Sequence, residues 1–310
     1  MSYHITLKQY IMSQLGLIIK NEYLTDLKAK SFWIGTILVP ILFGAFSIFI
    51  GFLIQDSEAT KKLANPAAPD PSEMTGIQSM GMLCGIFLAL FLMIYGAQIF
   101  NKVKKEKSNR VMEVLATCVT GRTMMLGKII SVGLLGLTQM MIWFAMIFTV
   151  IAGLMFILNF SIPIEYLTDS RIYIGILWSF LFFLGGYVFY GSIYAACGAM
   201  TDKDNENQAY MTVITFLLLG SFYIGEFAVT NAENPFVVFC EFFPFTSPTI
   251  AAVNAVASAV PLWQSILALV VLYAFAAISV VLSGKIYTSS LLLKGKRFSP
   301  KDILLFLKSK

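Results

Sequence analysis

The residues best placed to do chemistry lie between Asn101 and Lys128, a strongly basic interruption between two hydrophobic stretches. Read at 3.6 residues per turn, part of this segment carries one apolar stripe, which predicts a short amphipathic helix. The stripe consists of Val111, Val114, Leu115 and Cys118. Arg110 and Glu113 lie beside it. A short helix of this kind can fill a groove in a partner protein, so the predicted chemistry is docking. A solvated basic loop that only sets topology is the alternative.

The same segment does not bind nucleotide. A phosphate-binding loop needs the pattern G-x-x-x-x-G-K-[ST], in which the last hydroxyl binds Mg²⁺. The nearest stretch, Gly121 to Ile129, has one residue too many between its glycines and an isoleucine at the hydroxyl position. We therefore expect no cofactor in this chain, and an ATP-driven function would need a separate ATP-binding chain.

Other catalytic and metal-binding patterns are missing too. A single histidine, His4, excludes the H-E-x-x-H motif, and no G-x-S-x-G occurs in the hydrophobic stretches, which argues against an intramembrane enzyme. The four cysteines are scattered without C-x-x-C spacing, so neither a zinc site nor a disulfide framework is predicted. We expect no catalytic residue and no metal ligand in this chain.

The composition is that of an integral membrane protein. Hydrophobic residues make up 58% of the chain, charged residues only 13%, and the mean hydropathy is +0.79. A helix needs about 20 residues to cross the hydrocarbon core of a bilayer. Six stretches are long and apolar enough, which predicts an all-α fold with six spans. They are Phe32–Ile54, Met80–Phe100, Ile129–Leu158, Ile172–Met200, Tyr210–Val229 and Leu262–Gly284.

Charge fixes the predicted topology of the chain, which we expect to form a single transmembrane domain over residues 1–310. The segments predicted to lie outside hold only Lys61, Lys62 and Arg171, which leaves 19 of the 22 lysines and arginines inside. By the positive-inside rule, the segments 101–128 and 285–310 are cytoplasmic, and so are both termini.

Three further segments complete this organisation. Residues 1–31 predict a cytoplasmic helix lying on the inner leaflet, with Leu7, Ile11, Leu15 and Ile18 on one face. Residues 55–78 form an external loop rich in proline and acidic side chains. Residues 235–260 are apolar but interrupted by prolines, which predicts a re-entrant external hairpin of two half-helices between the fifth and sixth spans.

Several motifs together resemble one known family. They are Asn21–Thr25 with Lys30–Phe32, Tyr95–Gln98, Glu106–Leu115, Leu126–Ile129 and Phe243–Pro248. These stretches resemble the ABC type-2 exporter permeases, and most of all the NatB-type sodium-efflux branch, over most of the chain. Many members of that branch carry a folded external domain where this chain has only the loop 55–78.

The resemblance implies a function and a site. In that family the E-K-x-x-R-x-x-E-x-L helix docks on a separate ABC ATPase subunit, which binds ATP and Mg²⁺. The matching residues here are Glu106, Lys107, Arg110, Val111, Glu113, Val114 and Leu115. The family also implies a multi-pass protein of the bacterial plasma membrane. Because ABC transporters have two nucleotide sites, one docking helix per chain implies a permease homodimer in membrane lipid. No nucleic-acid partner is expected.

Candidate residues for the translocation path or gate are few. Glu226 is an acidic residue within an otherwise apolar span, which is costly at membrane depth. Glu226 is either an interfacial acid that reaches water or a functional residue facing the dimer cavity. In the second case it contacts the exiting substrate or holds the hairpin closed through a polar partner such as Asn254. Gln139 is a further polar candidate in the third span.

The substrate stays open at this point. Sodium efflux is what the resemblance implies, and Thr138, Gln139, Ser179 and Thr215 offer oxygen ligands in the spans. Two alternatives are an exporter of a larger amphiphile such as a lipid, peptide or drug, and a membrane scaffold that transports nothing. A neighbouring gene for an ATPase would favour transport.

The charge asymmetry makes the topology testable. In intact cells, a cysteine in place of Ala67 in the external loop should react with an impermeant maleimide, whereas one in place of Lys104 should not. The reverse labelling pattern would contradict the predicted orientation.

Overall fold

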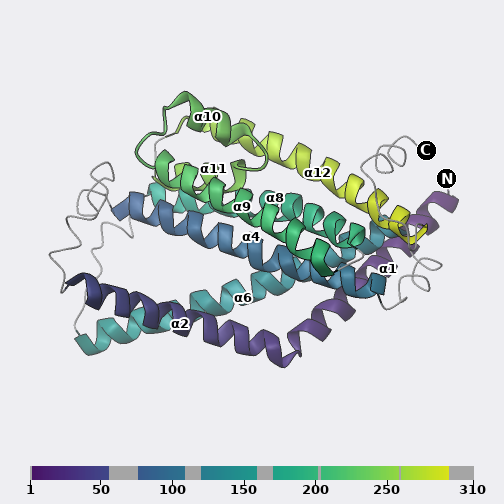
Figure 1. Cartoon of the computed structure of the whole chain (residues 1–310), viewed down its shortest axis with the longest axis horizontal. Coiled ribbons are helices and arrows are strands. Elements are labelled where there is room, and N and C mark those ends of the chain that lie inside the picture. The colour runs from purple at the N-terminus through teal and green to yellow at the C-terminus, as the bar shows by residue number, and fades with distance from the viewer. Residues whose placement is uncertain are drawn as a thin grey trace.

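The computed structural model describes residues 2–55, 76–108, 120–158, 170–201, 204–257 and 260–292, and in these residues every regular element is an α-helix. Figure 1 shows the helices arranged largely lengthwise. They are α1 (Ser2–Leu27), α2 (Lys30–Gln55), α4 (Gly76–Ser108), α6 (Gly121–Leu158), α8 (Ser170–Met200), α9 (Asp204–Ala228), α10 (Pro235–Phe242), α11 (Ser247–Ala257) and α12 (Leu262–Leu292). The all-α prediction is confirmed for the described residues.

Five of the described helices are long and apolar enough to cross a membrane. The spans are Gly81–Lys107, Thr123–Thr149, Tyr173–Met200, Gln208–Ala228 and Leu262–Ser290. They correspond to the second to sixth predicted spans. The first predicted span falls within α2, whose apolar portion is described over Lys30–Leu42. A total of six spans therefore stays a prediction.

Several helices extend beyond the ends predicted from hydropathy. α4 continues past Phe100 through the basic residues to Ser108, and α6 begins at Gly121 rather than Ile129. The predicted segment 101–128 is thus helical at both ends, and residues 109–119 lie outside the described residues. Hydropathy marks where side chains become charged, but lysine and glutamate are good helix formers, so the backbone continues in the same conformation.

A short break separates the first two helices. The predicted interfacial segment 1–31 is divided, because α1 ends at Leu27 and α2 begins at Lys30. Trp33 Nε1–H donates to the Leu27 carbonyl (2.9 Å), which satisfies one of the acceptors left open at the end of α1. α1 packs against α6, with Leu15 and Ile18 of its predicted apolar face over Gly127. Its position on the inner leaflet stays a prediction.

Pro40 accounts for a hydrogen bond that connects α2 to α6. A proline has no N–H to donate to the carbonyl four residues earlier, so the Thr36 carbonyl loses its helical partner. Trp143 Nε1–H of α6 donates to that carbonyl instead, at 2.8 Å. In an apolar environment, a carbonyl without a hydrogen-bond donor costs free energy. The bond from Trp143 removes this cost, so α2 can accommodate the proline, and it also orients the two helices.

The core lies around α8, which packs against α4, α11 and α12 (Figure 1). Large buried aromatic side chains fill the space between α4 and α8. Phe91 and Phe183 meet edge to face, with ring centroids 4.6 Å apart, and Tyr187 packs on both rings. The Tyr187 hydroxyl donates to the Ile129 carbonyl at 2.7 Å and so connects α8 to α6.

Two short helices, α10 and α11, occupy the segment predicted as the hairpin. Asn234 caps α10 by accepting the Phe236 N–H (3.0 Å), and Pro235 occupies the first helical position, where its missing N–H costs nothing. α10 ends just before Pro244, because a proline disfavours helical geometry in the residue that precedes it. Immersion of this pair in the outer leaflet stays a prediction.

The turn between α10 and α11 is held by two longer helices. The Phe245 carbonyl accepts hydrogen bonds from Tyr190 of α8 and from Ser221 of α9, the latter at 3.2 Å. Glycine lets α11 approach α4 closely as well. A Cβ on Gly81 would lie 2.6 Å from Ala257 Cβ, and one on Gly85 would lie 2.5 Å from Val253. These two glycines, four residues apart on α4, therefore form a close helix contact.

The close approach of α8 to the backbone of α4 gives a test of the fold. A Cβ at Gly198 of α8 would lie 2.7 Å from the Phe100 carbonyl oxygen of α4, and backbone cannot move aside as a side chain can. Gly198→Ala should lower the stability by about 1–3 kcal/mol, seen as a lower Tm in detergent. Gly220→Ala is the matched control, because its Cβ meets open space, and its Tm should be unchanged or higher. Equal Tm values for both variants would contradict this packing.

Candidate functional site

Five charged side chains gather where α1, α4 and α6 meet, and we refer to them as the ion cluster. Its members are Glu22 and Asp26 of α1, Lys102 and Glu106 of α4, and Lys128 of α6. The cluster contains three acids and two lysines. Its bonded members are between 22 and 106 residues apart in the sequence, and it lies beside the end of α4 that leads into residues 109–119.

Lys128 is the centre of the ion cluster, and its side chain is fully buried. Its ammonium group contacts Glu22 Oε1 at 2.7 Å and also donates to Glu106. Lys102 bonds to the other Glu22 oxygen at 2.9 Å and to Asp26. Glu22 therefore bridges the two lysines. A buried ammonium group is tolerated only when opposite charges and hydrogen bonds compensate its lost hydration.

The electrostatics of Glu22 follow from this position. Burial by itself would raise the pKa of Glu22, but the charges of Lys128 and Lys102 outweigh burial and hold the pKa below its ordinary value of 4.5. Glu22 is thus ionised at neutral pH. Ser131 of α6 donates to its carboxylate at 3.4 Å, and the Tyr287 hydroxyl of α12 reaches Glu106 at 3.4 Å, so the cluster touches a fourth helix.

Two residues of the predicted docking motif make contacts inside this chain. Glu106 faces Lys128 in the ion cluster. Lys107 donates to the Ala199 carbonyl at 2.8 Å, in the last turn of α8, where a cation also complements the helix dipole. The other predicted docking residues lie outside the described residues. They are Arg110, Val111, Glu113, Val114 and Leu115. Contact of this motif with an ATPase stays a prediction.

The predicted path residues are not brought together. Gln139 is buried in α6 and accepts a hydrogen bond from Tyr95 of α4. Glu226 is exposed on α9. Asn254 is fully buried in α11, and its amide donates to Glu241 of α10 at 3.3 Å rather than to Glu226. No hydrogen bond between Glu226 and Asn254 is present among the described residues, and a gate role for Glu226 stays a prediction.

Glu241 is the buried polar residue that the sequence interpretation missed. Its side chain is fully buried, and Gln264 at the start of α12 donates to the same carboxylate oxygen as Asn254 does, at 2.8 Å. Three short or terminal helical segments thus meet at one carboxyl group. A signal was available, because no lysine, arginine or histidine occurs between Lys203 and Lys285, so an acid in this stretch needs neutral partners.

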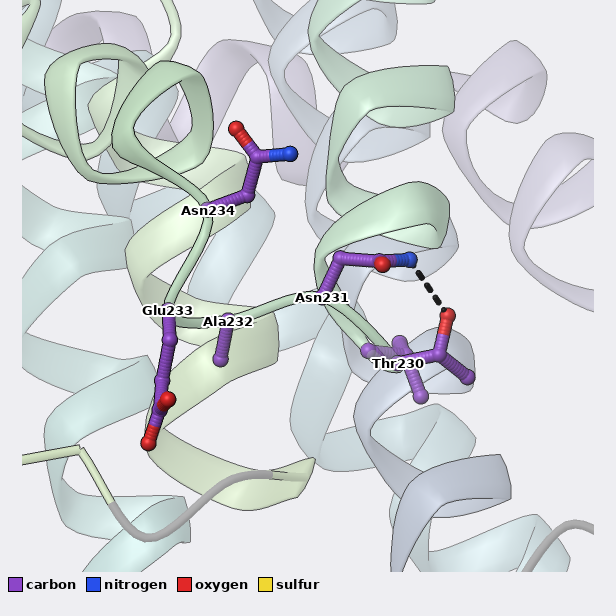
Figure 2. A pocket seen from close by; sticks show the side chains of 6 residues that line it. Thr230, Asn231, Ala232, Glu233 and Asn234 are labelled. Carbon is purple, nitrogen blue, oxygen red and sulfur yellow. Dashed lines mark hydrogen bonds between the residues drawn. The ribbon is translucent and has the colours of Figure 1, made fainter.

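An open hollow lies at the turn between α9 and α10 (Figure 2). Its lining is Val229, Thr230, Asn231, Ala232, Glu233 and Asn234. Asn231 donates to the Thr230 hydroxyl at 2.9 Å across the hollow's edge. Because all the lining residues belong to one turn, the hollow is the surface of that turn and not a path between helices.

Comparison with known proteins gives a family and distant relatives. The family model described as ABC-2 family transporter protein matches residues 53–285. The uncharacterized protein YhaP of Bacillus subtilis (strain 168) is 24% identical over 244 residues, which cover 73% of this chain and 56% of that protein. The uncharacterized protein MJ1024 of Methanocaldococcus jannaschii is 22% identical over 206 residues, covering 66% of this chain and 48% of that protein. The chain thus spans about half the length of these curated relatives. No solved structure matches.

The ion cluster predicts a strong effect of one substitution. Lys128→Met should remove about 3–5 kcal/mol of stability, because Glu22 and Glu106 are left facing each other without the buried cation. Lys102→Met is the matched comparison and should cost less, because Lys102 and Asp26 are partly exposed to solvent. Tm and yield in detergent measure both. Adding Glu106→Gln to Lys128→Met should restore part of the loss. A Tm unchanged in Lys128→Met would mean that the cluster contributes nothing to folding.

Proposed function

Because the chain belongs to the ABC-2 family of transporter proteins, we propose that it is the membrane-spanning permease subunit of an ATP-driven exporter. The match over residues 53–285 carries this proposal. The multi-pass helical architecture supports it, since five described helices can cross a membrane. ATP and Mg²⁺ are bound by a separate ABC ATPase subunit, and the permease supplies the translocation path in the bacterial plasma membrane.

The ATPase docks on the cytoplasmic segment that follows α4. The docking residues are Glu106, Lys107, Arg110, Val111, Glu113, Val114 and Leu115. Glu106 has a further role in this proposal, because it belongs to the ion cluster and can pass a displacement of the docking segment to Lys128 and Glu22. A rigid, charge-paired junction of α1, α4 and α6 transmits such a displacement better than a flexible linker would.

The active assembly contains two permeases and two ATPases. One docking segment per chain and two nucleotide sites per ABC transporter support this stoichiometry. Mass measurement of the complex in nanodiscs tests it. A complex of one permease and one ATPase that still hydrolyses ATP and transports would rule it out.

Sodium is the proposed cargo, on the strength of the resemblance to the NatB-type branch. The polar groups considered as ligands are partly engaged within the chain. Thr138 bonds to Tyr23 (2.9 Å), Gln139 to Tyr95, and Ser179 to the Ala252 carbonyl (3.4 Å). A sodium ion bound by Thr138, Gln139 or Ser179 would have to share or replace one of these hydrogen bonds.

Transport assays separate the proposed functions. Permease and ATPase are reconstituted together in vesicles, and ATP-dependent movement of radioactive sodium is measured. ATP-dependent sodium accumulation supports the proposal. ATP hydrolysis stimulated by a lipid, peptide or drug without sodium movement would favour export of a larger amphiphile. Failure to bind any ATPase would favour a scaffold.

The docking segment provides the mutational test. Glu113→Arg and Leu115→Asp should each weaken ATPase co-purification and lower transport, because one reverses a charge and the other places a charge in the apolar stripe. Membrane insertion and yield should stay normal. Glu233→Arg is the control, because the same charge reversal at an exposed residue of the α9–α10 turn should leave ATPase binding intact. Normal co-purification of the ATPase with both docking variants would favour the alternative that this segment is a solvated loop.

A further inference from the structure

Only one of the two carboxyl oxygens of Glu241 has hydrogen-bond partners among the described residues. Its Oε2 accepts two amide hydrogen bonds, from Gln264 at 2.8 Å and Asn254 at 3.3 Å. Its Oε1 is buried and has no hydrogen-bond partner among the described residues, and the same is true of Asn254 Oδ1. Both of these oxygens are acceptors. Each such atom buried without a donor costs free energy comparable to a lost hydrogen bond.

The charge of Glu241 also lacks compensation in the sequence around it. No basic residue occurs between Lys203 and Lys285, a stretch that includes α9, α10, α11 and most of α12. An isolated carboxylate in such surroundings is far more expensive than the neutral acid. Burial raises the pKa of Glu241, and the hydrogen bonds from Gln264 and Asn254 offset only part of that increase.

The titratable groups on the surrounding elements supply no positive charge either. Cys240 is the only other titratable residue of α10, and α11 has none. On α9 and the turn after it, Glu226 and Glu233 are exposed acids. The first titratable residue of α12 is Tyr273, whose hydroxyl donates to the Leu181 carbonyl at 3.1 Å.

We propose that Glu241 is a proton-binding site, occupied at neutral pH, in which the carboxylic acid donates its Oε1–H to Asn254 Oδ1. A carboxylic acid and a carboxamide form a pair with one donor in each direction. The bond from Asn254 to Oε2 is one half of that pair, and the proton supplies the other half. One proton from water thus satisfies both orphaned oxygens and removes the buried charge.

The site has a mechanical consequence. Glu241 joins α10 to α11 through Asn254 and to α12 through Gln264. Loss of the proton restores a buried negative charge that no cation in this stretch balances, and α10 then loosens from α11 and α12. Proton binding therefore stabilises the packing of this helix pair. This inference does not rest on the proposed export function.

Infrared spectroscopy tests the protonation directly. In the purified full-length permease at neutral pH, we expect the C=O stretching band of a protonated carboxyl group. The band should be lost in Glu241→Gln and kept in Glu226→Gln, which removes an exposed acid. Asn254→Ala should move the band to higher frequency, because the acid loses a hydrogen bond at each oxygen. Absence of the band in the wild-type protein, or a band that Glu241→Gln leaves intact, would overturn the proposal. A band that Asn254→Ala does not move would overturn the assignment of the proton's acceptor.

Thermal unfolding gives an independent readout. The pKa of Glu241 is raised above its ordinary value of 4.5 in the folded protein, so the folded state holds the proton more tightly than the unfolded state. The Tm of the wild-type protein should therefore fall as pH rises above 4.5, more steeply than the Tm of Glu241→Gln, whose amide imitates the neutral acid at every pH. Parallel Tm profiles would overturn the proposal. A stabilisation by sodium chloride over choline chloride that Glu241→Gln abolishes would also overturn it, because the occupant would then be a metal cation.

Discussion

The cost of burying a charge is the constraint on which this structure depends. Most of the chain offers only apolar surface, which cannot compensate an ammonium group removed from water. Lys128 is fully buried, so its helix has to be placed where Glu22 and Glu106 reach it. This requirement brings α1 onto α6 and aligns the end of α4 with both. The remaining helices then pack by shape, through aromatic rings and glycine contacts, around a junction that charge has already positioned.

The two buried polar clusters meet this cost in different ways. In the ion cluster, opposite charges compensate one another, and solvent reaches its edges at Lys102 and Asp26. At Glu241 the partners are neutral amides, so a negative charge there would be balanced by hydrogen bonds alone. In the first arrangement, each buried charge faces a charge of the opposite sign. In the second arrangement, the charge of the junction depends on whether a proton occupies Glu241. The ion cluster and Glu241 lie toward opposite ends of the helices.

Five of the six predicted spans coincide with described helices that are long and apolar enough to cross a membrane, because long apolar stretches are a strong sequence signal. The sequence predicts their ends poorly, since α4 and α6 continue as helices into charged residues where hydropathy stops. The ion cluster could not be predicted, because Glu22 and Lys128 are 106 residues apart and nothing local indicates their pairing. Glu241 lies in the stretch predicted as two half-helices. The lack of basic residues between Lys203 and Lys285 indicates that it needs neutral partners, but nothing local indicates that these are Asn254 and Gln264. The docking residues from Arg110 to Leu115 stay predictions.

The order of the ion cluster along the chain bears on how the protein is made. Glu22, Asp26, Lys102 and Glu106 all precede Lys128, so every partner of that lysine has been synthesised before it leaves the ribosome. Chains emerge and fold from the N-terminus onward. The junction can therefore close when α6 inserts, before α9 to α12 have entered the membrane. If the junction closes in that order, the later helices are added to three helices that charge already holds together.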